Sequence, residues 1–153
     1  MRLKLIIAIT LETLLIMAHG GLMNGLNGAS AINCYSAGVL NTTSTSSRTG
    51  VLLINGASLT NCYYLDGIQG TTRIIPETGA TVFYKTSEDE EAMTTAKVVA
   101  ALNNYIELKG LIAEGDAEVN TTGWCKWVVG EDNLPALDFN TEWNGTTWVT
   151  TNN

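Results

Sequence analysis

Histidine, cysteine and positive charge are all scarce in this sequence. It contains one His (His19), three Cys and eight Lys and Arg residues, against 15 Asp and Glu. Most metal sites and many nucleophilic sites are built from clusters of His and Cys, so few such sites can be assembled here. The net charge of −7 argues against DNA or RNA as a partner, because nucleic-acid affinity rests on Lys and Arg contacts to phosphates.

Small polar residues are what the chain has in abundance. Thr, Asn, Ser and Gly fill more than a third of the 153 positions, while hydrophobic residues make up 45% and charged residues 15%. The apolar share is sufficient for a buried core, so the composition is that of a folded chain. Helical bundles are rich in Ala, Glu, Lys, Leu and Arg instead, so the composition argues against a helical bundle.

Residues 1–19 form a separate, signal-like segment. Two basic residues, Arg2 and Lys4, precede an apolar run, as in a secretory signal. Glu12 lies inside that run, where a carboxylate is costly to bury. Three other interpretations stay open: a half-buried strand, a retained membrane anchor, or an internal stretch of a longer polypeptide. If Met1–Ala18 acts as an export signal, the protein is expected outside the cell or on its surface.

An internal repeat occupies residues 20–67. Gly28–Tyr35 and Gly56–Tyr63 share six identities in eight positions, at a constant offset of 28. Short strand-like pieces with this period, separated by Gly, Asn and Ser, are typical of a solenoid whose coils are strands joined by turns. Equivalent residues of successive coils would then lie one strand spacing apart, about 4.8 Å.

Stacking of the two copies predicts contacts between identical residues. Asn33 would lie over Asn61 in a turn, where side-chain amides hydrogen-bond along a stack. Cys34 would lie over Cys62 inside the core, either as a disulfide or as two stacked thiols. Thiols are favoured, because the strand geometry points both side chains the same way. Cys125 is left over as an odd cysteine.

The two copies belong to a longer pattern. Gly20–Gly25 and Asn33–Gly38 form its first unit, and Gly50–Leu52 and Asn61–Gly67 form its second. This pattern resembles the GLUG motif of bacterial cell-surface proteins, whose units read roughly Gly-Gly-Leu-Val-Gly and then Asn-Cys-Tyr. The resemblance implies a right-handed β-helix displayed outside the cell, often within a large adhesin-like or protease-associated polypeptide. It does not imply a catalytic motif. The repeat positions that it assigns are Gly21, Leu22, Asn33, Cys34, Tyr35, Asn61, Cys62 and Tyr63.

Residues 68–153 are predicted to form a connector and a cap over the open end of the solenoid. Ser87 is the expected N-cap of a helix over about 88–104, with Glu90 as its capping-box partner. The order of Lys85–Ser87, this helix and Leu134–Leu137 is similar to the way in which GLUG-like arrays end. The helix is supported by an apolar stripe at three- and four-residue spacing: Met93, Ala96, Val99, Leu102 and Ile106.

Two of the four Trp residues are candidates for ligand binding. Trp143 and Trp148 flank an Asn-Gly turn and, with nearby acids, could provide a platform on which a sugar ring stacks. The turn is expected to pair Glu142–Trp143 with Thr147–Trp148.

Burial is the other interpretation of the Trp side chains, and it is the favoured one. Trp124 and Trp127 would then pack on the helix while the hairpin closes the end of the molecule. Four Trp residues are the largest source of buried area that so small a cap has.

A catalytic constellation is not found in the sequence. Acids alternate in Glu114–Glu118, but the ligand spacing of an EF-hand loop is absent. Within residues 20–67, Arg48 and Asp66 are the only ionisable side chains apart from thiols and phenols, so the two carboxylates of glycoside hydrolysis are missing. We therefore expect no enzyme, no metal and no cofactor.

These observations predict a mainly β fold: a right-handed parallel β-helix with an α-helical and Trp-rich C-terminal cap. The expected function is a non-enzymatic structural and adhesive module of an extracellular bacterial protein. The alternative is a carbohydrate-binding or carbohydrate-active module that uses Trp143 and Trp148. Expected partners are glycans or proteins of a host or cell surface, and further solenoid repeats or self-association through strand edges. Because about three repeats are needed for stability and two are visible, the isolated chain is expected to be marginally stable.

Overall fold

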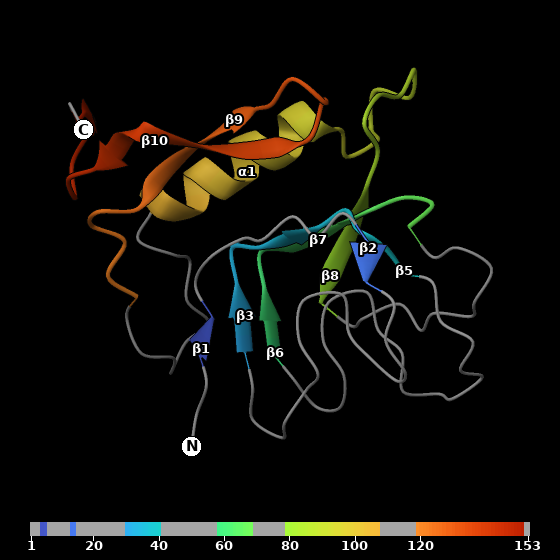
Figure 1. Ribbon diagram of the computed structural model, residues 1–153, viewed down its shortest axis with the longest axis horizontal. Helices are drawn as coiled ribbons and strands as arrows, with labels where there is room; N and C mark the ends of the chain where they lie inside the picture. Colours follow the sequence, from blue (N-terminus) through green and yellow to red (C-terminus); the bar gives the residue numbers. More distant parts are fainter. Residues whose placement is uncertain are drawn as a thin grey trace. The chain divides into compact units, whose positions relative to one another are not determined.

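A computed structural model, drawn in Figure 1, shows the fold of the chain. It describes residues 4–5, 13–14, 30–40, 58–68, 79–107 and 119–151. The repeat residues Gly21 and Leu22, most of the signal-like segment and Glu114–Glu118 lie outside the described residues. The chain divides into two compact units, Met1–Met93 and Thr94–Asn153.

The N-terminal unit is built from short parallel strands. Its described strands are β1 (Lys4–Leu5), β2 (Thr13–Leu14), β3 (Ser30–Ile32), β4 (Tyr35–Ser36), β5 (Val39–Leu40), β6 (Ser58–Thr60), β7 (Cys62–Leu65) and β8 (Ala80–Phe83). They form sheets in the orders β1-β3-β6, β2-β5 and β4-β7-β8, and all of these pairings are parallel.

The two copies of the repeat pair with each other in register. β3 pairs with β6 and β4 with β7, in both cases between equivalent residues of the two copies, as in Tyr35 with Tyr63. Between the strands of each copy, Asn33 and Asn61 take left-handed conformations, with φ of 56° and 51°. Asn tolerates this conformation better than most residues, so it turns the chain sharply before the next strand. The expected register between the two copies is confirmed.

The predicted fold class, a right-handed parallel β-helix with a terminal cap, is wrong. The described residues form small separate sheets, parallel in one unit and antiparallel in the other, together with one helix. The period of the repeat does not continue beyond the two copies: Lys4 pairs with Ser30 and Cys62 pairs with Ala80, each at a shorter separation in the sequence than that between the copies. A solenoid stacks successive copies of one unit, whereas the strands that flank these two copies come from sequence without the repeat.

The C-terminal unit packs one helix on an antiparallel sheet. Helix α1 (Thr95–Glu107) lies against β9 (Cys125–Val129) and β10 (Pro135–Trp143), and β11 (Trp148–Thr150) pairs with the last residues of β10 (Figure 1). An amphipathic helix has to bury its apolar stripe, and here the sheet of the same unit covers it. No helix in the described part of the chain is long and apolar enough to cross a membrane. The buried hydrophobic residues in the described part of the unit are Val98, Leu102, Tyr105, Ile106, Val119, Trp127 and Trp143.

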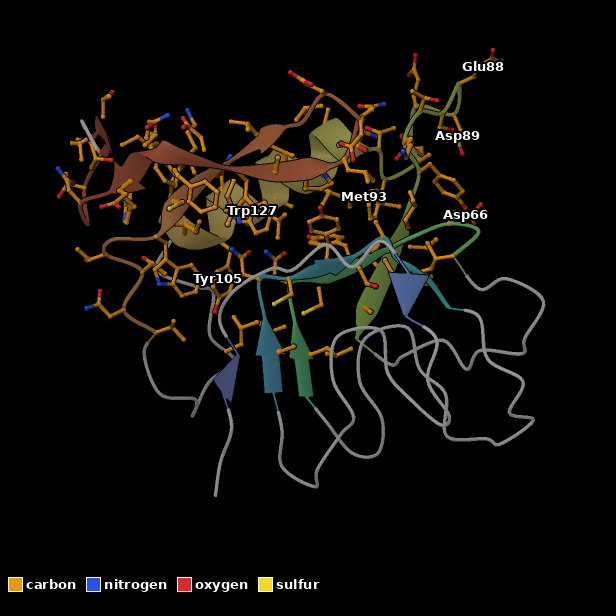
Figure 2. All side chains as sticks on the ribbon, in the orientation of Figure 1. Asp66, Glu88, Asp89, Met93, Tyr105 and Trp127 are labelled. Atoms are coloured by element: carbon orange, nitrogen blue, oxygen red, sulfur yellow. The ribbon has the colours of Figure 1, made fainter. Side chains whose placement is uncertain are left out.

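Helix α1 begins later than predicted. It starts at Thr95 instead of near residue 88, and it ends at Glu107. The Ser87 hydroxyl accepts a hydrogen bond from the Asp89 backbone N–H at 3.1 Å, which makes a local turn in an exposed loop. Figure 2 shows Asp89 near the tip of this loop. Ser87 and Glu90 therefore do not cap the helix, and the predicted capping box is wrong.

A backbone contact just before the helix explains the later start. The Met93 carbonyl accepts a hydrogen bond from the Tyr84 N–H at 2.8 Å, which ties Met93 to the end of β8. The Val98 N–H donates to the Thr94 carbonyl at 2.9 Å, so the first helical turn forms only after that tie. The buried stripe shifts accordingly, and Ala96 is exposed. The side chains that α1 buries are Thr95, Val98, Leu102, Tyr105 and Ile106.

Candidate functional site

The Asn and Tyr residues of the repeat form a hydrogen-bonded ladder. Asn61 donates from its Nδ2 to the Oδ1 of Asn33 at 2.6 Å, and the Tyr63 hydroxyl donates to the Oδ1 of Asn61 at 2.6 Å. Asn33 is 1% exposed, and its Nδ2 has no hydrogen-bond partner in the described part of the chain. The predicted stack of side-chain amides is confirmed, and its polar groups bind one another.

The two repeat cysteines are buried thiols without a disulfide between them. Cys34 donates its S–H to the Ile32 carbonyl at 3.0 Å, and Cys62 donates to the Ala31 carbonyl at 3.3 Å. A hydrogen bond with Cys62, together with burial, raises the pKa of Cys34 far above its usual range. The thiolate is the reactive form of cysteine, so Cys34 is unsuited to act as a nucleophile at neutral pH.

The repeat tyrosines complete the core of the N-terminal unit. Tyr35 is 1% exposed and meets the ring of Phe83 edge-on, with centroids 6.2 Å apart and planes at 75°. Burial, with a smaller contribution from Cys62, raises the pKa of Tyr63. The described residues of the Asn-Cys-Tyr triplets thus contribute packing and internal hydrogen bonds.

The predicted binding residues Trp143 and Trp148 lie next to each other in the C-terminal unit. They are cross-strand partners on β10 and β11, with ring centroids 5.3 Å apart and planes at 59°. Trp143 is only 7% exposed, whereas Trp148 is half-buried. The Trp148 Nε1 donates to the Glu107 Oε1 at 2.6 Å, and the Lys126 ammonium lies 5.8 Å from the centroid of the Trp148 ring. The two rings therefore do not form an open, flat platform.

The turn between these two Trp residues is wider than predicted. Trp143 pairs with Trp148 and Glu142 with Val149, so the loop between the strands has four residues, Asn144–Thr147. The Asn144 Oδ1 accepts hydrogen bonds from the backbone N–H groups of the last two loop residues, both at 2.9 Å. The predicted pairing is wrong by one residue, because the Asn144 side chain organises a four-residue loop.

Trp124 and Trp127 pack on α1, as the favoured interpretation predicted. Trp124 stacks on Tyr105, with centroids 6.4 Å apart and planes at 23°. Trp127 is 4% exposed, and Figure 2 labels it in the same unit as Tyr105. Asn103 binds the Trp127 backbone twice, donating from Nδ2 to its carbonyl and accepting at Oδ1 from its N–H, both at 2.9 Å. Leu102-Asn103 belongs to the sequence features that resemble the end of a GLUG-like array, but these two contacts of Asn103 were not predicted.

A small group of ionisable side chains lies across β9 and β10. Lys126 faces Asp138 and Cys125 faces Glu142 in the strand register. Burial, with the charges of Glu142 and Asp138, raises the pKa of Cys125. Hydrogen bonds, first among them the one from the Thr141 hydroxyl at 2.7 Å, lower the pKa of Asp138. Within the described ranges, no group of three or more His, Cys, Asp and Glu side chains could hold a metal ion.

Comparison with known proteins gave no match to a family model, to a curated protein or to a solved structure. Function is therefore inferred from the contacts of the chain and from the pattern of its repeat.

Proposed function

We propose that the chain is a non-enzymatic structural and adhesive module of an extracellular bacterial protein. The observation that carries this proposal is the ladder of Asn33, Asn61 and Tyr63, with the thiols of Cys34 and Cys62 beside it. These are the residues that the two copies share, and they bind one another. The hydrogen bond between Asn33 and Asn61 joins the two copies, so it holds them in register, and the bond from Tyr63 fixes the Asn61 side chain within the second copy. The resemblance of the repeat to the GLUG motif supports a place on the cell surface.

Self-association through a strand edge belongs to the same proposal. β8 pairs with β7 on one side, and no strand among the described residues pairs with its other side. Ala80–Phe83 carries neither a charge nor a Pro, which are common means of keeping strand edges apart. Sedimentation at increasing protein concentration tests this part: Val82→Lys should keep the chain monomeric where the parent sequence associates. A parent chain that stays monomeric throughout would contradict it.

Surface display tests the main proposal. The chain is expressed in a bacterium with a C-terminal epitope tag, in one strain with residues 1–19 and in another with a proven export signal before residue 20. We expect the tag on intact cells to be open to antibody and to external protease, and the cells to adhere to host-cell glycoproteins more than cells without the chain. A tag that stays inside in the first strain, or cells of the second strain that do not adhere, would overturn the location or the adhesive role respectively.

Carbohydrate binding through Trp143 and Trp148 stays the alternative. The 7% exposure of Trp143 supports packing over stacking on a sugar. A glycan array with the parent chain and Trp148→Ala separates the two roles. Binding that disappears in the variant at an unchanged melting temperature would favour the alternative, whereas a lowered melting temperature without any glycan binding favours packing.

A further inference from the structure

Two loops of the C-terminal unit carry the acceptor pattern for Asn-linked glycosylation. The pattern is Asn-x-Ser/Thr without Pro at the middle position. It occurs as Asn120-Thr121-Thr122 and again as Asn144-Gly145-Thr146. In both places a Glu stands two positions before the Asn, at 118 and at 142. The sequence thus carries the five-residue pattern Glu-x-Asn-x-Thr twice, and Glu142 of the second copy lies on β10.

A third Asn-x-Thr in the sequence lacks the upstream Glu and therefore serves as a control for the five-residue pattern. Asn41-Thr42-Thr43 is a third Asn-x-Thr, and it lies outside the described residues. Val39 takes the place of the acid there. A transferase that reads the upstream acid would therefore distinguish Asn41 from the other two.

Both acceptor Asn residues of the C-terminal unit are exposed and share one local conformation. The Asn120 Oδ1 accepts a hydrogen bond from the Thr122 N–H at 3.0 Å, and the Asn144 Oδ1 accepts one from the Thr146 N–H at 2.9 Å. Within the described part of the chain, no hydrogen bond engages the Nδ2 of either Asn. Nδ2 is the atom that receives the sugar, and the Thr of each pattern is exposed as well.

The two loops are neighbours in space. The Gly123 N–H donates to the Trp143 carbonyl at 2.8 Å, which joins the end of one pattern to the start of the other. A Cβ placed on Gly145 would lie 3.4 Å from the Thr122 Oγ1. Both acceptors therefore lie at one end of the C-terminal unit, outside the core between helix and sheet.

We propose that Asn120 and Asn144 are acceptors for an oligosaccharyltransferase whose co-substrate is a polyprenyl-pyrophosphate-linked oligosaccharide. The Asn Nδ2 attacks the anomeric carbon of the first sugar and forms a C–N bond. The C–O bond to the pyrophosphate breaks, the lipid pyrophosphate leaves with the electron pair, and Nδ2 gives up one proton to a base of the transferase. The upstream carboxylate offers a charged group that a cationic subsite of the transferase can bind.

The proposal rests on the proposed function in one respect, because a lipid-linked donor reaches only exported chains. Transfer by purified components removes this dependence. The folded chain is incubated with a purified bacterial oligosaccharyltransferase that requires the upstream acid, and with its lipid-linked oligosaccharide. Glycopeptides are then assigned by mass spectrometry. We expect glycan on Asn120 and Asn144 and none on Asn41.

Matched variants make the test specific for the pattern. Thr146→Val should abolish transfer to Asn144, while Thr147→Val, the next residue of the same loop, should leave it unchanged. Glu142→Gln should slow transfer to Asn144 at least tenfold and leave Asn120 unaffected. Circular dichroism verifies that each variant is folded.

The outcomes separate this inference from the proposed function. Absence of glycan from both Asn residues, or transfer to Asn144 that ignores Thr146→Val and Glu142→Gln alike, would overturn the inference and leave surface display untouched. Transfer in the purified system, with a tag that stays inside the cell, would overturn the surface location and support the acceptor sites.

Discussion

The contacts within the N-terminal unit differ in kind from those within the C-terminal unit. In the N-terminal unit identical residues of two copies meet, as Asn33 meets Asn61 at 2.6 Å. In the C-terminal unit unlike groups meet, as the Asn103 side chain binds the Trp127 backbone. Duplication of a repeat unit creates contacts between identical residues of neighbouring copies. A contact between unlike groups instead depends on one particular pair of residues. The difference predicts that the units respond to different substitutions.

The two units can be followed separately in solution. All four Trp residues lie in the C-terminal unit, so Trp fluorescence reports on its unfolding. Hydrogen exchange measured on peptides from β3, β6 and β7 reports on the N-terminal unit.

Leu102→Ala should have the largest effect, and the C-terminal unit should carry it. Leu102 is fully buried on α1, so its removal leaves a cavity and should lower the free energy of unfolding by about 2–5 kcal/mol. Urea unfolding followed by Trp fluorescence measures the loss. Asn104→Ala, at an exposed position of the same helix, is the control and should change little. An equal loss of exchange protection in β3, β6 and β7 would show that the units do not respond separately.

Asn61→Ala should weaken the N-terminal unit. It removes the middle group of the ladder, at a cost of about 1–3 kcal/mol. It also replaces Asn, which tolerates the left-handed φ of 51°, by Ala, which does not, at a further cost of up to about 1–2 kcal/mol. Asn61→Gly loses the amide but keeps the backbone conformation, so it should be the milder of the two. Unchanged exchange protection in both variants would mean that the ladder contributes nothing to stability.

Asn103→Ala should destabilise the C-terminal unit by about 1–3 kcal/mol, because both hydrogen bonds to the Trp127 backbone are lost at a partly buried site. The measurement is again urea unfolding followed by Trp fluorescence. Asn104→Ala makes the same substitution at the next residue without such a pair of bonds. Ala favours the helix more than Asn does, so helix propensity cannot lower the stability of either variant. An Asn103→Ala variant as stable as Asn104→Ala would rule out the paired contact as a source of stability.

Alkaline pH should lower the stability of the N-terminal unit, and we expect this effect to be the smallest of the four. An ordinary thiol has a pKa of about 9.0, and that of Cys34 is raised in the folded chain. Below about pH 9 the thiol is protonated in both the folded and the unfolded state, so its contribution to the free energy of unfolding does not change with pH. Above it only the unfolded state releases the proton, so stability should fall by about 1.4 kcal/mol per pH unit.

The same urea unfolding, followed by circular dichroism at several alkaline pH values, measures this slope. Cys34→Ala should flatten it just above pH 9, while Tyr63, whose pKa is also raised, starts to contribute only above its ordinary value of about 10.0. A slope that Cys34→Ala leaves unchanged would rule out this thiol as its source.

Local contacts were predicted better than architecture. Six identities at one offset were enough to predict the register between the copies, because identical side chains stack only when the strands align. They carried no information on the strands that flank the copies, which is why the solenoid prediction was wrong. The capping pattern at Ser87 and Glu90 failed for a similar reason: the bond between Tyr84 and Met93 decides where the helix can begin.

At the candidate site of Trp143 and Trp148, the sequence likewise predicted the local hairpin but not its detailed geometry. An Asn-Gly pair before a Trp predicted a hairpin, but the width of its loop depends on hydrogen bonds to the Asn144 side chain. Which Trp side chain is exposed to solvent depends on its neighbours in the folded unit, and the spacing of residues in the sequence does not reveal these neighbours. Burial of Trp143 and the bond from Trp148 to Glu107 come from packing of the helix against the sheet.

By itself the sequence determined that the chain has a core, that its two repeat copies pair in register and that their Asn and Cys residues stack. The core follows from the composition. The pairing and the stacking follow from the constant offset between the two copies, because in-register parallel strands place equivalent residues in contact. Only the tertiary structure decided how many strands join each sheet, where α1 begins and which Trp side chains are buried. Those outcomes depend on particular pairs of unlike residues, such as Glu107 and Trp148, separated by 41 positions, and pairs of that kind leave no period in the sequence.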